Sequence, residues 1–332
     1  MRIRAAVSRF HLELLFPIIV IASGLSVASP HFLNLQNFVN IGNQIAINVI
    51  IALGMTLLIT GGGIDLSVGS NVALTGVIVA QFFQMGAHGT GSVLLAILLG
   101  LGVGVAIGVV NGLIISLLEV PPFICTLGTM TTLRGLALIA SNGRPIMGMP
   151  DRFLNVFYGF AAGIPKPVIT ALLLSILVAF IFNKTTFGRK TKAIGGNERC
   201  VRVCGINIVG MKILMYGLVG GLAGMAGLVL TTTMATAEPL AGTWYELEAI
   251  AVVVMGGTLL EGGKGTILGT LFGALLLGLV RNGLNLLRVH ATYHTLVVGL
   301  LILFSVVISS DSFAGTTRGL WSRIGGRNPS KK

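Results

Sequence analysis

Ionisable residues that could do chemistry inside this chain are few and widely separated. Asp65 follows an apolar run, in the segment 63–69 (Gly-Ile-Asp-Leu-Ser-Val-Gly), where an ionised carboxylate would be costly in a membrane. We interpret Asp65 as a capping or loop-ordering group for a helix that begins near residue 66, with direct contact to a substrate or ion as the alternative. Glu246 and Glu248 lie two positions apart and do not share a helix face, which argues against a catalytic carboxylate pair.

A glycine-rich segment at 262–266 (Gly-Gly-Lys-Gly-Thr) has a composition that could cradle phosphate. A nucleotide-binding P-loop needs Gly six residues before its lysine and Ser or Thr directly after it, but these positions hold Thr258 and Gly265. His290 and His294 lack the helical His-Glu-x-x-His metal pattern, and we interpret them as exposed histidines of a turn. The sequence therefore predicts no catalytic residues, no metal site and no cofactor bound by this chain.

Seven of the 22 basic residues lie in the segment 184–212, against a single acid, Glu198. Asn197 suits a helix N-cap, Glu198 suits the first turn and Gly205 suits a C-terminal stop, so a helix of about two turns fits between them. A helix this short is unstable alone, which indicates burial in a partner's groove; a solvated cytoplasmic loop or a helix on anionic lipid is the alternative. The candidate docking residues are Asn197, Glu198, Arg199, Val201, Arg202, Val203 and Gly205.

The composition is that of an integral membrane protein. Hydrophobic residues make up 54% of the 332 and charged residues only 10%, whereas soluble domains contain about 25% charged residues. No charge lies between Glu13 and Asp65 or between Arg288 and Asp311. The net charge of +12 fits Lys and Arg kept in cytoplasmic loops better than it fits binding of nucleic acid.

Apolar runs bounded by polar, Gly or Pro residues predict an all-α protein of about ten membrane spans. The expected spans lie near residues 12–29, 41–60, 66–85, 92–118, 123–141, 166–183, 206–234, 246–259, 266–287 and 292–310. We expect the first to be an uncleaved signal anchor. Basic residues before the first span and in the tail 311–332 predict two cytoplasmic termini, and the segment 184–212, after six spans, falls on the same side.

Glycine spacing predicts close helix packing and two special loops. Gly104, Gly108 and Gly112, like Gly220 and Gly224, recur every fourth residue, which lets helix backbones approach closely in lipid. Two further glycine clusters, two hundred residues apart, each follow a similar apolar run. This weak internal repeat points to a transport pathway. The candidate pathway or gating residues are Gly62, Gly63, Asp65, Ser67, Gly262, Gly263 and Lys264.

The longest expected external loop, 142–165, contains Arg144 and Arg152 and several prolines that should keep it from extending a helix.

Several segments together resemble the permease subunits of ribose-type sugar ABC importers. They are 52–57 with 62–70, 122–128, 193–197 with 205–207, and 246–251 with 262–265, in the expected order along nearly the whole chain. The resemblance is specific for the family and weaker for the substrate, since related permeases serve ribose, galactose, xylose, allose and the autoinducer-2 signal. The Gly-Gly-Ile-Asp-Leu-Ser-Val-Gly match argues against a branched-chain amino-acid permease.

The resemblance implies one permease domain over 1–332, with the type II importer arrangement of about ten helices, in a bacterial inner membrane. Expected partners are a second permease subunit, a cytosolic ATPase that binds ATP and Mg²⁺, a periplasmic sugar-binding protein and membrane lipids. The coupling helix maps onto about 197–204, although this chain has larger and charged residues where the family usually has small ones. Arg144 and Arg152 are candidates for docking the binding protein.

The resemblance also implies transport by alternating access. A sugar handed over from a binding protein needs only a weak site within the pathway, which would explain why the spans show no obvious polar sugar pocket. A self-powered secondary transporter remains the alternative; it should show buried acids or histidines.

Overall fold

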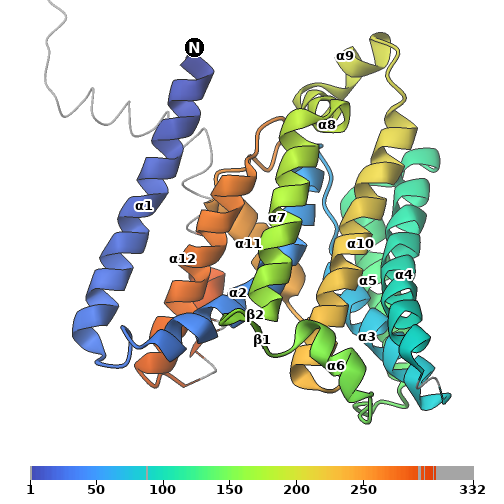
Figure 1. Ribbon diagram of the computed structural model, residues 1–332. Coiled ribbons are helices and arrows are strands. Elements are labelled where there is room, and N and C mark those ends of the chain that lie inside the picture. The colour runs from blue at the N-terminus through green and yellow to red at the C-terminus, as the bar shows by residue number, and fades with distance from the viewer. Residues whose placement is uncertain (1, 87–88, 291–292, 295, 302, 304–332) are drawn as a thin grey trace, which may run out of the picture.

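The computed structural model describes residues 2–86, 89–290, 293–294, 296–301 and 303 as a helical bundle (Figure 1). The helices are α1 (Arg2–Ala28), α2 (Leu35–Thr60), α3 (Val68–Gln84), α4 (Thr90–Leu117), α5 (Pro122–Ala140), α6 (Asp151–Phe157), α7 (Lys166–Lys184), α8 (Thr186–Gly196), α9 (Glu198–Val203), α10 (Ile208–Met234), α11 (Tyr245–Met255) and α12 (Ile267–Leu286). Strands β1 (Phe160–Ala161) and β2 (Ile164–Pro165) pair antiparallel in a small hairpin.

Nine of the ten expected spans each coincide with one helix, so the all-α membrane class is confirmed. Within the described residues, six helices are long and apolar enough to cross a membrane: α2, α4, α5, α7, α10 and α12. The apolar part of α1, Leu14–Ala28, and α3 are shorter, and α11 has 11 residues, enough for about half a bilayer. The tenth expected span, 292–310, lies largely outside the described residues, and so does the tail, 311–332. The number of crossings therefore stays a prediction.

The expected irregular loop at 142–165 contains more structure than its prolines indicated. Pro150 precedes α6 as its N-cap residue and Pro167 lies in the first turn of α7, positions where the missing N–H of proline is harmless. Ile146 pairs with Ala237 in an isolated antiparallel bridge, which ties this loop to the chain that follows α10.

The core forms around α2 and α10. From Ala46 to Thr60 every residue of α2 is buried, and α2 contacts α7, α10, α11 and α12. α10 packs along α4 through the glycines whose spacing predicted close approach: a Cβ at Gly108 would collide with the carbonyl oxygen of Tyr216, and one at Gly220 with that of Gly104. Nothing larger than glycine fits where these backbones touch.

The two ends of the bundle differ. α8 and α9 lie at one end, together with the N-terminal end of α1, while α6 and the β-hairpin lie at the other (Figure 1). The basic segment and the first residues of the chain are thus on the same side.

Replacing Gly108 by Ala should lower the thermal stability of the purified protein, because overpacking of this kind costs about 1–3 kcal/mol. Gly102, on the same helix, is exposed and has no atom within 4 Å of a Cβ built on it. The matched change Gly102→Ala should leave the thermal midpoint unchanged or raise it slightly. Equal midpoints for the two variants would contradict the close α4–α10 contact.

Candidate functional site

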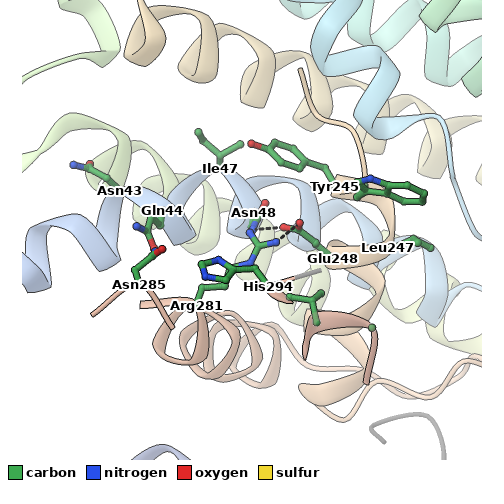
Figure 2. A pocket seen from close by; sticks show the side chains of 13 residues that line it. Asn43, Gln44, Ile47, Asn48, Tyr245, Leu247, Glu248, Arg281, Asn285 and His294 are labelled. Carbon is green, nitrogen blue, oxygen red and sulfur yellow. Dashed lines mark hydrogen bonds and ion pairs between the residues drawn. The ribbon is translucent and has the colours of Figure 1, made fainter. Parts of the chain in front are cut away.

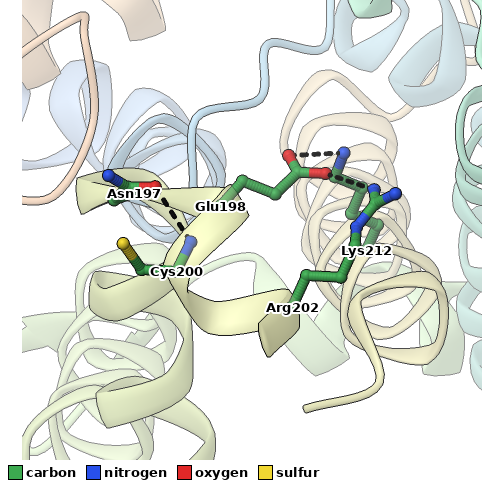
Figure 3. Close-up of polar contacts among 5 residues, drawn as sticks. All are labelled: Asn197, Glu198, Cys200, Arg202 and Lys212. Atoms are coloured by element: carbon green, nitrogen blue, oxygen red, sulfur yellow. Dashed lines mark hydrogen bonds and ion pairs between the residues drawn. The ribbon is translucent and has the colours of Figure 1, made fainter. Parts of the chain in front are cut away.

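The expected docking helix is present as α9, a single capped helix outside the bundle. Asn197 is its N-cap, and its Oδ1 accepts a hydrogen bond from the backbone N–H of Cys200 at 3.0 Å (Figure 3). Gly205 has φ +75°, a left-handed conformation that favours glycine and lets the chain leave the helix. The predicted cap and stop are both confirmed.

The two valines of α9 face different surroundings, which corrects the prediction that both form one docking surface. Val201 is buried in a small cluster with Ile194 of α8 and with Ile208 and Met211 of α10. Val203 is 89% exposed. Val201 therefore holds α9 against the bundle, whereas Val203 and the exposed Arg199 and Arg202 are open to a partner.

Glu198 ties α9 to α10 through Lys212 and also pairs with Arg202 within α9. Its carboxylate oxygens lie 2.9 Å from Lys212 Nζ and 3.3 Å from Arg202 Nη2 (Figure 3). Partial burial by itself raises the pKa of Glu198, but the hydrogen bond and charge of Lys212, followed by those of Arg202, outweigh burial and leave its pKa below the ordinary value. The charged form of Glu198 is the one that positions α9.

α8, which the sequence analysis did not predict, connects α9 to the bundle. It lies against the end of α7, where a Cβ at Gly188 would collide with the carbonyl oxygen of Phe182. Lys192 places its ammonium group 4.0 Å from the centre of the Phe182 ring, and burial lowers the pKa of Lys192. These contacts fix the direction in which α8 leaves α7.

The C-terminal end of α8 lies between the two glycine loops of the predicted pathway. The N–H of Gly263 donates to the carbonyl oxygen of Thr60 at 2.8 Å, joining the loop after α11 to the end of α2. Gly195 of α8 lies directly against this hydrogen bond. A Cβ on Gly195 would collide with the Thr60 carbonyl oxygen and stand 2.6 Å from the Gly263 backbone nitrogen. Gly262 has φ +91°, and a Cβ on it would stand 3.0 Å from the Cα of Gly195. We call these contacts among Thr60, Gly195, Gly262 and Gly263 the glycine junction.

Asp65 orders the chain between α2 and α3, as one of the two interpretations predicted. Its Oδ1 accepts hydrogen bonds from the backbone N–H and the hydroxyl of Ser67, at 2.8 and 2.6 Å. The Ser67 hydroxyl accepts from Asn111 Nδ2 on α4 at 2.9 Å, and Asn111 Oδ1 accepts from Thr129 Oγ1 on α5 at 2.7 Å. This chain of donors and acceptors connects α5, α4 and the start of α3. Asp65 is thus committed to holding helices together.

The other predicted residues are not among the four that form the junction. Lys264, which directly follows Gly263, is exposed. Arg144 and Arg152 are exposed near α6, at the opposite end of the bundle from α9.

A buried ion pair was missed by the sequence analysis. Glu248 of α11, whose side chain is 7% exposed, pairs with Arg281 of α12 and accepts a hydrogen bond from Asn48 of α2 at 2.9 Å (Figure 2). The three residues are separated by up to 233 positions in the sequence, and no local motif marks them. The sequence offers one general signal of such a pair. An acid and a base that both lie in apolar spans are expected to pair, because burying either charge alone is costly.

These features define a multi-pass helical membrane protein with a short capped helix, α9, outside the bundle, and a preceding helix, α8, whose C-terminal end contacts two internal glycine loops. Residues 37–306 match the family described as "Branched-chain amino acid transport system / permease component". The chain belongs to this family of transport-system permeases.

Individual relatives carry more specific names. The chain is 45% identical to the ribose import permease protein of Bacillus subtilis over 302 residues, which cover 90% of this chain and 92% of the relative. It is 41% identical to the ribose import permease protein of Escherichia coli K12, covering 89% and 92%. It is 36% identical to the D-allose transport system permease protein of the same strain, covering 87% and 88%. No solved structure matches the chain.

Replacing Gly195 by Ala should open the glycine junction, because the new methyl group would occupy the space of the Thr60 carbonyl. Hydrogen–deuterium exchange in the loop 256–266 should become faster as the Gly263–Thr60 hydrogen bond is lost. Gly196 is the matched control, since nothing lies within 4 Å of a Cβ built on it. If Gly195→Ala and Gly196→Ala protected this loop equally, the junction would not be the contact described.

Lowering the pH should release α9 from α10. Because the folded-state pKa of Glu198 is lowered, its ion pairs contribute above the unfolded-state pKa and are lost as the pH falls through the folded-state value. A spin label on Cys204, in a Cys200→Ser background, should become more mobile once the pH falls below the ordinary pKa of a glutamate. The effect should be modest, since the Glu198 side chain is 37% exposed. Glu198→Gln should be mobile already at neutral pH; an identical pH response in that variant would contradict the assignment to Glu198.

Proposed function

We propose that this chain is the permease subunit of an ABC importer that carries a monosaccharide across the bacterial inner membrane. The observation that carries the proposal is the 45% identity to a ribose import permease protein over 90% of the chain. Similarity to allose and L-arabinose permeases favours a monosaccharide but does not select one. Another sugar-like polyol, such as autoinducer-2, is the nearest alternative.

The proposed topology has ten crossings in a single domain, 1–332, with both termini and the loop 184–212 in the cytoplasm. In this orientation α8 and α9 project toward the cytosol, and α6 and the β-hairpin face the periplasm. Support comes from the nine helices that coincide with expected spans and from the N-terminal end of α1 lying at the same end of the bundle as α8 and α9.

We infer that α9 is the coupling helix, which binds a separate ATPase subunit that holds ATP and Mg²⁺. Exposed Arg199, Arg202 and Val203 offer that subunit two charges and one apolar contact. When ATP binding moves the ATPase, α9 and α8 would transmit the movement through the glycine junction to α2 and to the loop before α12. Alternating access would follow from that displacement, provided that the sugar interacts differently with the two states.

The remaining proposed partners are a periplasmic sugar-binding protein near Arg144 and Arg152, a second permease subunit, and membrane lipids. A secondary transporter is less well supported. Its coupling would need titratable groups free to bind a proton or sodium ion, but Asp65 is hydrogen-bonded to Ser67, and Glu248 is paired with Arg281.

Proteoliposomes test the function directly. The permease reconstituted with its ATPase and a ribose-loaded binding protein should import ribose only when ATP is supplied on the ATPase side. Import that continues without ATP, or without the ATPase, would contradict the proposal.

Val203→Asp should weaken binding of the ATPase at least tenfold, about 1.4 kcal/mol, while leaving the thermal midpoint of the permease unchanged. Val201→Asp should instead lower that midpoint, because it places a carboxylate among Ile194, Ile208 and Met211, at a cost of roughly 3 kcal/mol. Val203→Thr keeps the shape of the side chain and should bind nearly as well as the native protein. ATPase binding unaffected by Val203→Asp would exclude this docking surface.

A further inference from the structure

A cavity of about 460 Å³ lies between α2, α11 and α12, bounded also by the chain beyond α12 (Figure 2). It lies far from the glycine junction: Gln44 is sixteen helical residues before Thr60, roughly 24 Å along α2. The cavity therefore belongs to the half of the bundle opposite α8 and α9. The size falls within the range of small-molecule sites, about 300–1,000 Å³.

The cavity carries amide groups that the fold does not use. Asn43 and Gln44 of α2 and Asn285 of α12 line it, and none has a hydrogen-bond partner among the described residues. Asn43 Oδ1 is buried without a partner, so Asn43 offers the cavity its amino group alone. Gln44 and Asn285 each offer two donors and an accepting oxygen. Adjacent hydroxyl groups of a polyol need this mixture of donors and acceptors, because every hydroxyl both donates and accepts.

The two oppositely charged side chains that line the cavity cancel each other's charge. Glu248 and Arg281 form an ion pair at the cavity surface, and Asn48 donates to the other Glu248 oxygen. The pair satisfies its own charges, so an ionic ligand finds no unmatched charge among the described lining residues. Arg281 has five N–H donors and a 29% exposed side chain, so the donors that do not pair with Glu248 can bind neutral oxygen acceptors of a ligand.

An aromatic side chain stands at the edge of the cavity in an unusual backbone conformation. Trp244 has φ +73° and a 58% exposed indole ring, directly before α11 begins. A bulky residue held in the left-handed region is strained, and such strain concentrates at ligand sites. Gly242, two residues earlier, packs its backbone on Gly69 at the start of α3, which holds the turn in place. The flat indole face can cover the C–H face of a sugar ring.

We propose that this α2–α11–α12 cavity binds the transported ligand as a neutral polyol. Asn43, Gln44, Asn285 and Arg281 would bond its hydroxyl groups, and Trp244 would cover its apolar face. The inference rests on the proposed function in that the polyol is taken to be the transported sugar. Branched-chain amino acids fit poorly, since their ammonium and carboxylate groups would each need an unpaired counter-charge.

The chain supplies its own reporter for a test. It contains two tryptophans, so Trp321→Phe leaves Trp244 as the single fluorophore. The full-length protein in liposomes is titrated with D-ribose, with L-arabinose and, as a ligand of the other class, with L-leucine. The proposal predicts a saturable change in Trp244 emission with at least one of the two sugars, with a dissociation constant on the order of 1 mM, and no change with leucine.

Substitutions then separate the site from a general solvent effect. Gln44→Ala and Asn285→Ala, which remove no hydrogen bond within the described residues, should each weaken the response to sugar about tenfold. Asn40→Ala, on the exposed side of α2 outside the cavity, should leave it unchanged. No emission change with either sugar, an equal response to leucine, or an unchanged response in both cavity variants would each overturn the proposal.

The same preparations distinguish failure of this site from failure of the proposed function. The permease is also reconstituted with the ATPase and a sugar-loaded binding protein. If native permease imports sugar while the emission of Trp244 does not change, the proposed binding site is contradicted but the proposed function is not. Absence of import in the native protein would contradict the proposed function instead.

Discussion

The structure depends on three stretches of backbone meeting where no side chain fits. At the glycine junction the end of α2, the end of α8 and the loop before α12 approach so closely that the Gly263 N–H bonds the Thr60 carbonyl directly beside Gly195. Irregular backbone next to lipid is stable only when other protein groups satisfy it. The junction meets this requirement and, by the same contacts, fixes the end of α8 against the end of α2 and the loop before α12.

Rigid helices connect the junction to the rest of the molecule. α2 and α12 begin or end at it, and they are linked along their length by a hydrogen bond between the Thr56 and Thr270 hydroxyls at 2.6 Å and by reciprocal bonds between Asn37 and Asn282. The polar cavity lies between these same two helices. A displacement at α9 therefore has a continuous, well-packed route to the place where we propose that the sugar binds.

Sequence alone identified features whose signals are local. Hydropathy placed nine helices, and Asn197 and Gly205 marked both ends of α9, because caps and stops depend on neighbouring residues. The burial of Val201 was not predictable, since it depends on Ile208 and Met211 arriving from α10. α8 was missed because its glycines and threonines give weak helical preference, and its position depends on contacts with α7. The cavity was missed because Asn48, Glu248 and Arg281 are single polar residues in three distant spans.

We expect α9 and the glycine junction to move as one unit. Spin labels on Cys200 and on Glu261→Cys, both exposed, report the distance across that unit when Cys204 is replaced by Ser. A second pair, Cys200 with Leu240→Cys, reports its position relative to the segment between α10 and α11. In the complex with the ATPase, a non-hydrolysable ATP analogue should leave the first distance unchanged and alter the second. A change in the first distance with the second constant would contradict the account, because α9 would then move independently of the junction.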